Sequence, residues 1–84
     1  MKVFVTGVAG QLGHDVVNEL VKRGIQTVGS DIAQYYSGVD DGSAVTKNLY
    51  ISLDITDEQA VYEAIVEVKP DVVIHCAAWT AVDL

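Results

Sequence analysis

Three glycines at regular spacing give the clearest chemical signal in this 84-residue chain. The run Gly7-Val8-Ala9-Gly10-Gln11-Leu12-Gly13 separates a short apolar segment from a segment with helical periodicity. In such a turn Gly7 permits a tight bend, Gly10 lets the backbone approach a pyrophosphate, and Gly13 lets the helix pack close to the strand. Backbone N–H groups at the helix start then point at the phosphates, whose charge the helix dipole favours. The pattern predicts a dinucleotide-binding turn.

A carboxylate stands where a dinucleotide-binding domain needs one. Asp31 ends the second predicted strand, residues 26–31, about 20 residues beyond the glycines. At this spacing, dinucleotide-binding domains have an acidic side chain that accepts hydrogen bonds from the adenosine ribose. The same carboxylate would repel a 2′-phosphate, and no Lys or Arg follows it before Lys47. We therefore expect NAD or NADP as the cofactor, with NAD favoured.

The elements that position these groups are strands alternating with helices. Residues 2–6 are rich in β-branched and aromatic residues and continuous in their apolarity, which predicts a strand buried on both faces. Three further strands are predicted over residues 26–31, 49–53 and 72–78. Residues 32–48 show no period and are expected to form a long loop with room for one helical turn. The alternation predicts an α/β fold, the N-terminal part of a Rossmann-type parallel sheet with strand order 3-2-1-4.

Two helices are predicted between the strands. The first covers residues 11–23, ends at Gly24 and has His14 on its polar side. Its inward stripe is formed by Leu12, Val16, Val17, Leu20 and Val21. The second starts at Thr56, which fits a capping box with Gln59, and runs to about Val68. Its inward stripe is formed by Ala60, Val61, Ala64, Ile65 and Val68.

Composition and charge exclude several classes of function. Half of the residues are hydrophobic and 20% are charged, which is typical of a folded domain. The net charge of −7 argues against binding nucleic acid, which needs clustered Lys and Arg, and no apolar run reaches the roughly 18 residues of a membrane span. A single cysteine, Cys76, fits the cytoplasm. No metal site is expected, because Asp40 and Asp41 lack a third ligand at a defined offset.

These residues together resemble the extended short-chain dehydrogenase/reductase superfamily, whose signature Thr-Gly-x-x-Gly-x-x-Gly is matched by residues 6–13. Within it, Gly-Gln-Leu-Gly at 10–13, Asp-Ile-Thr-Asp at 54–57 and Ala-Ala-Trp-Thr-Ala-Val-Asp at 77–83 are similar to the dTDP-4-dehydrorhamnose reductase family. The resemblance implies an NAD(P)-dependent oxidoreductase that reduces the 4-keto group of a nucleotide-linked deoxysugar. It also implies that residues 1–84 are a partial NAD(P)-binding Rossmann domain, without the remainder of that domain and without the substrate domain.

The resemblance also implies roles for individual residues. Asp31 would hold the adenosine ribose, while Asp54 and Ile55 would flank the adenine. The pyrophosphate would lie on the glycine turn, formed by Gly7, Gly10, Gln11, Leu12 and Gly13. The path toward the nicotinamide ribose would be lined by Ala77, Ala78 and Thr80.

No catalytic residue is predicted within the 84 residues. The superfamily uses a Tyr with a Lys four residues later as its general acid, and no tyrosine of this chain has a Lys at that offset. We therefore expect the isolated chain to be inactive, with a nucleotide-sugar substrate bound only by a full-length protein. Its fourth strand lies at a sheet edge in the predicted order, so we also expect poor stability or self-association through that strand.

Two other functions stay open. Where the reductases commonly have Asn, this chain has His75, which is familiar from NAD-dependent nucleotide-sugar epimerases and dehydratases. A non-enzymatic regulatory relative, such as a methionine adenosyltransferase β-subunit-like binding protein, would keep the same fold. His75 and Cys76 are adjacent on a predicted strand and must point to opposite faces, so they cannot act together. Tyr35 and Tyr36 could cover the adenine or pack on the surface.

Overall fold

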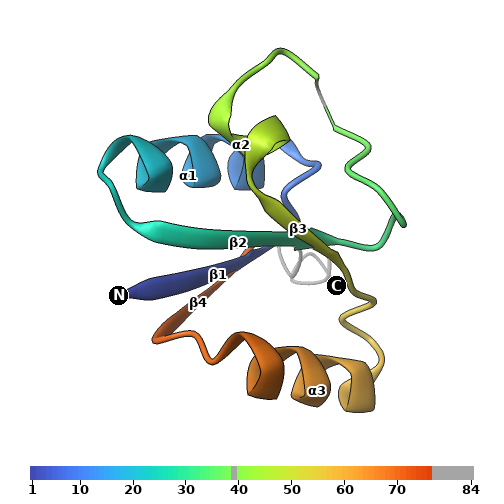
Figure 1. The fold of residues 1–84 in the computed structure, drawn as a ribbon. Coiled ribbons are helices and arrows are strands. Elements are labelled where there is room, and N and C mark those ends of the chain that lie inside the picture. Colours follow the sequence, from blue (N-terminus) through green and yellow to red (C-terminus); the bar gives the residue numbers. More distant parts are fainter. Residues whose placement is uncertain (39, 77–84) are drawn as a thin grey trace.

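The computed structural model describes residues 1–38 and 40–76, which form a parallel sheet with order β3-β2-β1-β4. The strands are β1 (Lys2–Thr6), β2 (Gln26–Asp31), β3 (Leu49–Ser52) and β4 (Val72–His75). The helices are α1 (Gln11–Lys22), α2 (Ala44–Lys47) and α3 (Glu58–Val68). Helices α1 and α2 cover one face of the sheet and α3 covers the other (Figure 1). This arrangement confirms the predicted Rossmann-type fold.

Strand β1 lies at the centre of the sheet. It pairs with β2 from Lys2↔Gln26 to Thr6↔Ser30, and with β4 from Val3↔Val72 to Thr6↔His75. The backbone N–H of Lys2 also donates to Asp71 Oδ2 at 2.7 Å, which ties the start of the chain to the entry of β4. The register places Thr6, Ser30 and His75 in one row across the carboxyl ends of three strands.

Both faces of β1 are buried, which explains why its apolar residues are continuous rather than alternating. The cluster on the α1 and α2 side consists of Val3, Val5, Val8, Val17 and Val45. The cluster on the α3 side consists of Phe4, Val28, Leu53, Ala64 and Val68. Consecutive residues of β1 thus alternate between two cores, and the sheet is held from both sides.

Fewer apolar helix residues face the core than the sequence analysis predicts. Leu12 is 55% exposed and Ile65 is 38% exposed, and Val21 also lies on the surface. Helix α1 instead meets the sheet along a narrow line that includes Gly13 and Val17. A helix touches a flat sheet along fewer residues than its apolar stripe contains, so residues at the margins stay exposed. Within the described part of the chain, no helix has the length and apolarity to cross a bilayer.

The start of α3 also differs from the prediction. Its N-cap is Asp57, whose side chain accepts a hydrogen bond from Ala60 N at 3.2 Å, and not Thr56. The Gln59 side chain does not reach back to the cap but donates to Glu63 Oε1. The capping box is therefore wrong, because Thr56 is held by another carboxylate, as described below. At the end of α1 the expectation is confirmed, since Gly24 adopts a φ of 76°.

The long connection at 32–48 contains the one-turn helix α2 and is fastened to α1. His14, expected on the polar side of the helix, is only 8% exposed. Its Nδ1 lies 2.9 Å from the Tyr36 hydroxyl and its Nε2 lies 3.4 Å from Asp41 Oδ2. Asn18 Oδ1 accepts a hydrogen bond from Val45 N at 2.9 Å. The loop and α2 thus bury a helix face that sequence periodicity assigned to solvent.

Strand β4 forms one edge of the described sheet, and its Val72 and Val73 side chains are exposed. Ile74 and Cys76 pack against the cluster on the α1 side, where burial raises the pKa of the Cys76 thiol. His75 is hydrogen-bonded instead to Thr6, with 2.7 Å between its Nδ1 and Thr6 Oγ1. The two residues therefore do not share a site, as expected.

Candidate functional site

The glycine turn between β1 and α1 contains two glycines that the fold itself requires. Gly7 has a φ of 76°, in the left-handed region that favours glycine. A Cβ atom on Gly13 would lie 2.2 Å from Gly7 O and 2.8 Å from Val8 Cα, both backbone atoms that cannot easily move. These residues let the chain turn sharply and let α1 lie against the turn, as the motif predicts.

Gly10 is different, because no described part of the chain explains it. Its φ of −82° and ψ of 166° are extended values that any residue adopts. A Cβ atom here would meet only Gly7 O at 3.6 Å, an ordinary contact. The missing side chain therefore leaves open space outside the turn, as needed where a ligand approaches the backbone.

The N-terminus of α1 is left without a side-chain cap. Gly10 occupies the N-cap position, and the first turn contains no acidic residue. Helix α3 offers the contrast within the same chain, since Asp57 caps it and Glu58 follows in its first turn. The first N–H groups of α1 are thus available to an anion that does not come from the α1 sequence itself. Gln11 and Leu12 are both exposed at this point.

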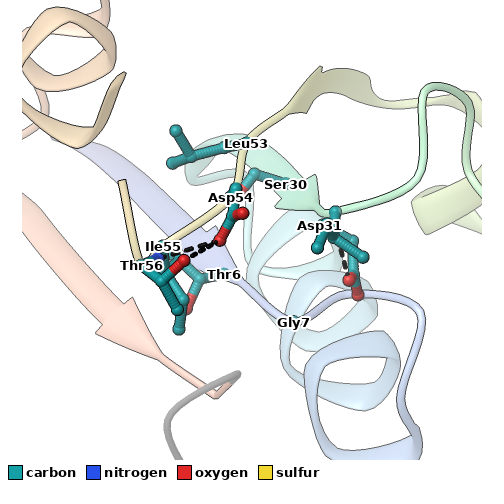
Figure 2. Close-up of a pocket in the computed structure, with 9 residues that line it drawn as sticks. Thr6, Gly7, Ser30, Asp31, Leu53, Asp54, Ile55 and Thr56 are labelled. Atoms are coloured by element: carbon teal, nitrogen blue, oxygen red, sulfur yellow. Dashed lines mark hydrogen bonds between the residues drawn. The ribbon is translucent and has the colours of Figure 1, made fainter. Parts of the chain in front are cut away.

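A pocket of about 260 Å³ opens at the carboxyl ends of β1 and β2, beside the segment that follows β3 (Figure 2). It is lined by Thr6, Gly7, Ser30, Asp31, Ile32, Leu53, Asp54, Ile55 and Thr56. Four residues expected to bind cofactor, namely Gly7, Asp31, Asp54 and Ile55, are thus brought together. Drug-sized ligands occupy roughly 300–1,000 Å³, so this pocket suits one part of a dinucleotide rather than the whole.

Asp31 joins the pocket to the glycine turn. Its Oδ2 accepts a hydrogen bond from Ala9 N at 2.9 Å, and its Oδ1 accepts one from Ile32 N at 2.7 Å. The carboxylate is therefore fixed in place before any ligand arrives, and it remains partly exposed. A ligand with hydroxyl donors could reach it from the pocket (Figure 2).

Asp54 lies across the pocket from Asp31 and is held by Thr56 (Figure 2). Both the Thr56 hydroxyl, at 2.6 Å, and the Thr56 backbone N–H, at 2.9 Å, donate to Asp54 Oδ1. The side-chain hydrogen bond from Thr56, followed by the backbone one, lowers the pKa of Asp54 below its usual value. The carboxylate thus stays ionised as an acceptor at the pocket rim, while Ile55 packs against the core cluster on the α3 side.

Five residues that line this pocket were not among the predicted site residues, namely Thr6, Ser30, Ile32, Leu53 and Thr56. Ser30 lies one position before Asp31, and its hydroxyl is buried without a partner among the described residues. A serine inside a strand gives no signal in the sequence, because only the three-dimensional surroundings show that its hydroxyl is unpaired. Three expected site residues, Ala77, Ala78 and Thr80, lie outside the described part of the chain.

The tyrosines of the long loop do not line the pocket. Tyr35 is 77% exposed, whereas Tyr36 packs against His14 and Tyr50. Burial, followed by the charge of Asp41, raises the pKa of Tyr36. Asp41 in turn accepts a hydrogen bond from Ser43 N at 2.9 Å. Tyr36 therefore has a packing role, against α1 and β3.

A parallel sheet of this order, with a glycine turn after its first strand and a carboxylate at the end of its second, defines a Rossmann-type fold. Within that class, the chain belongs to the family described as RmlD substrate binding domain, whose model matches residues 1–84.

The chain is similar to curated proteins over almost its whole length. It is 40% identical over 80 residues to a dTDP-4-dehydrorhamnose reductase from Streptomyces griseus, a match that covers 95% of this chain and 20% of the relative. It is also 40% identical over 83 residues to "Probable low-salt glycan biosynthesis reductase" from Haloferax volcanii, covering 99% of this chain and 25% of that protein. The chain therefore spans a fifth to a quarter of the length of these relatives.

Among solved structures, the chain resembles the UDP-glucose 4-epimerase of Thermus thermophilus in complex with NAD. The two are 29% identical with a TM-score of 0.73, and the match covers 90% of this chain and 24% of the epimerase. The fold of the described residues is thus shared with a sugar-nucleotide enzyme that was solved with a bound dinucleotide.

Proposed function

We propose that residues 1–84 form the dinucleotide-binding part of a reductase that acts on a nucleotide-linked 4-keto sugar. The full protein would use NAD(P)H, as the resemblance to the dTDP-4-dehydrorhamnose reductase of Streptomyces griseus suggests. The bound dinucleotide would supply the hydride for this reduction. The general acid and the substrate domain would come from sequence outside these 84 residues, which contain no Tyr-x-x-x-Lys.

The observation that most supports cofactor binding is the open space at Gly10. Gly7 is explained by its positive φ and Gly13 by its contact with the turn, but nothing in the described chain requires Gly10 to lack a side chain. A pyrophosphate could lie against the backbone in that space. The partial positive charge at the uncapped N-terminus of α1 would stabilise its negative charge. This fit needs no cation, which suits an acidic chain.

The proposed division of roles follows the positions of the residues. Gly7, Gly10, Gln11, Leu12 and Gly13 would hold the pyrophosphate. Asp31 would accept hydrogen bonds from the adenosine ribose, and Asp54 and Ile55 would hold the adenine. Ala77, Ala78 and Thr80 would lie toward the nicotinamide.

The proposal favours NAD over NADP. Asp31 is fixed at the edge of the pocket by Ala9 N and Ile32 N, so it cannot easily turn away from a 2′-phosphate. A calorimetric titration of the chain with NADH and with NADPH tests this, and we expect NADH to bind more tightly. An Asp31→Asn variant should show a smaller difference between the NADH and NADPH affinities, because it removes the negative charge that repels the 2′-phosphate.

The matched control is Asp40→Asn, which removes an exposed loop carboxylate outside the pocket and should leave the preference unchanged. A tenfold preference for NADPH, about 1.4 kcal/mol, would contradict the role of Asp31. Absence of binding by either dinucleotide would contradict the proposed function as a whole.

A second candidate is an NAD-dependent epimerase or dehydratase, favoured by His75 and by the likeness to the Thermus thermophilus epimerase. Dinucleotide retained through purification would favour it, whereas exchangeable cofactor would favour the reductase. The proposal includes a cytoplasmic location, since the one cysteine of this chain has no partner for a disulfide within it. It also includes self-association of the isolated chain through the exposed edge strand β4.

A further inference from the structure

The hydroxyl of Ser30 is an unsatisfied buried polar group at the candidate site. The residue is 0% exposed, and its Oγ has no hydrogen-bond partner among residues 1–38 and 40–76. The main chain of Ser30, in contrast, is hydrogen-bonded: its carbonyl oxygen accepts from Gly7 N at 2.8 Å and from Val8 N at 3.2 Å. A buried hydroxyl without a partner destabilises the folded state, so its presence calls for a functional explanation.

Ser30 is one of the residues that line the pocket, and it pairs with Thr6 in the β1–β2 register. The other polar side chains of the pocket are engaged within the protein. Thr6 Oγ1 is bonded to His75, both oxygens of Asp31 accept from backbone N–H groups, and Asp54 is bonded to Thr56. Ser30 thus differs from every other polar side chain that lines this pocket.

The Ser30 hydroxyl is not held by a hydrogen bond to any described residue, so no such bond has to break before it turns toward a ligand. Rotation about the single χ1 angle of Ser30 moves Oγ between staggered positions. A hydroxyl both donates and accepts, so it matches the mixed edge of a heteroaromatic base. Leu53 and Ile55 also line the pocket, and apolar side chains suit the faces of a planar ring.

We propose that Ser30 is a specificity-determining residue whose hydroxyl forms a hydrogen bond with the adenine base of the dinucleotide. The inference rests on the proposed function and extends it, because it names a base contact from β2 in addition to Asp54 and Ile55. The free chain keeps an unsatisfied group, and binding of the base satisfies it.

The test is the Ser30→Ala variant, measured for thermal stability without ligand and for affinity by calorimetry. Removing an unsatisfied hydroxyl should leave the melting temperature equal to that of the unchanged chain or raise it. The same change should weaken NADH binding by roughly five- to tenfold. ADP-ribose, which keeps the adenosine half but lacks nicotinamide, should lose the same factor.

Ser52→Ala is the matched control, since this serine is exposed, lies outside the pocket lining and has a hydroxyl that donates to Ile32 O at 3.3 Å. This control should change neither the affinity for NADH nor the affinity for ADP-ribose. Unchanged NADH affinity in Ser30→Ala, an equal loss in Ser52→Ala, or a lower melting temperature in Ser30→Ala would each overturn the assignment. Ser30→Cys provides a second measurement: a thiol is a weak donor, so this variant must also bind NADH more weakly than the unchanged chain.

The experiment separates this inference from the proposed function. If the unchanged chain binds NADH and ADP-ribose while Ser30→Ala binds them equally well, only the role of Ser30 is wrong. If the unchanged chain binds neither, both proposals are wrong.

Discussion

Replacing Gly10 and Gly13 by alanine, one at a time, adds the same methyl group at two points of one turn with opposite consequences. At Gly13 the new Cβ would lie 2.2 Å from Gly7 O and 2.7 Å from Gly7 C. Both are backbone atoms at the end of β1, so α1 must move away from the turn. At Gly10 the nearest atom would be Gly7 O at 3.6 Å, and nothing must move.

The expected magnitudes follow from these contacts. Overpacking at Gly13 should cost about 1–3 kcal/mol of unfolding free energy. For a domain of this size each kcal/mol lowers the melting temperature by about 4–8 °C. At Gly10, alanine is a poorer N-cap than glycine by roughly 0.5 kcal/mol, but it also restricts the unfolded chain by about 0.4–1 kcal/mol. These effects nearly cancel, so the stability of Gly10→Ala should stay close to that of the unchanged chain.

Thermal melts and NADH titrations on both variants distinguish the two roles. We expect Gly13→Ala to melt well below the unchanged chain, and Gly10→Ala to melt normally but bind NADH more than about tenfold more weakly, because its methyl occupies the space for the pyrophosphate. The reasoning is refuted if Gly10→Ala binds NADH normally. It is also refuted if Gly10→Ala loses as much stability as Gly13→Ala, since Gly10 would then be needed by the fold.

Two further predictions concern the α3 side of the site. Asp57→Ala removes the N-cap that accepts from Ala60 N, and chemical denaturation should show a loss of about 0.5–2 kcal/mol, whereas an unchanged midpoint would mean that the cap is not formed. The Thr56 hydroxyl and N–H lower the pKa of Asp54, so this carboxylate stabilises the fold above its unfolded-state pKa, and the contribution is lost as the pH falls through the lowered folded-state value. In Thr56→Ala an NMR titration should show the Asp54 pKa moving up toward its usual value, and an unmoved pKa would contradict the role of the hydroxyl.

Sequence patterns predicted the elements well where local rules and tertiary structure agree. The bounds of β1 and β2 match the predicted ranges: β1 is continuously apolar and ends before a glycine, and β2 ends on the carboxylate Asp31. Periodicity failed where the neighbours of a helix decide its burial. His14 became buried because Tyr36 and Asp41 come back from a distant loop, which no pattern within α1 could reveal.

The candidate site was predictable to the extent that it follows from topology. Asp31, Asp54 and Ile55 come after parallel strands whose carboxyl ends share one edge, so their meeting in one pocket follows from strand order. The hydrogen bonds within the site did not follow. Which carboxylate holds Thr56 depends on the conformation of a short turn, and two candidates, Asp54 and Asp57, both lie within two residues of it.

The central position of β1 has a consequence for how the chain folds. On one side β1 pairs with β2, which follows after a single helix, but on the other it pairs with β4, and the bond from Lys2 N to Asp71 spans 69 residues. Contacts between residues so far apart form late, because a long loop must close first. During synthesis, β1 therefore keeps one edge open until β4 has been made. An open edge of an apolar strand pairs readily with other chains, so this is the interval in which the nascent chain most needs protection by a chaperone.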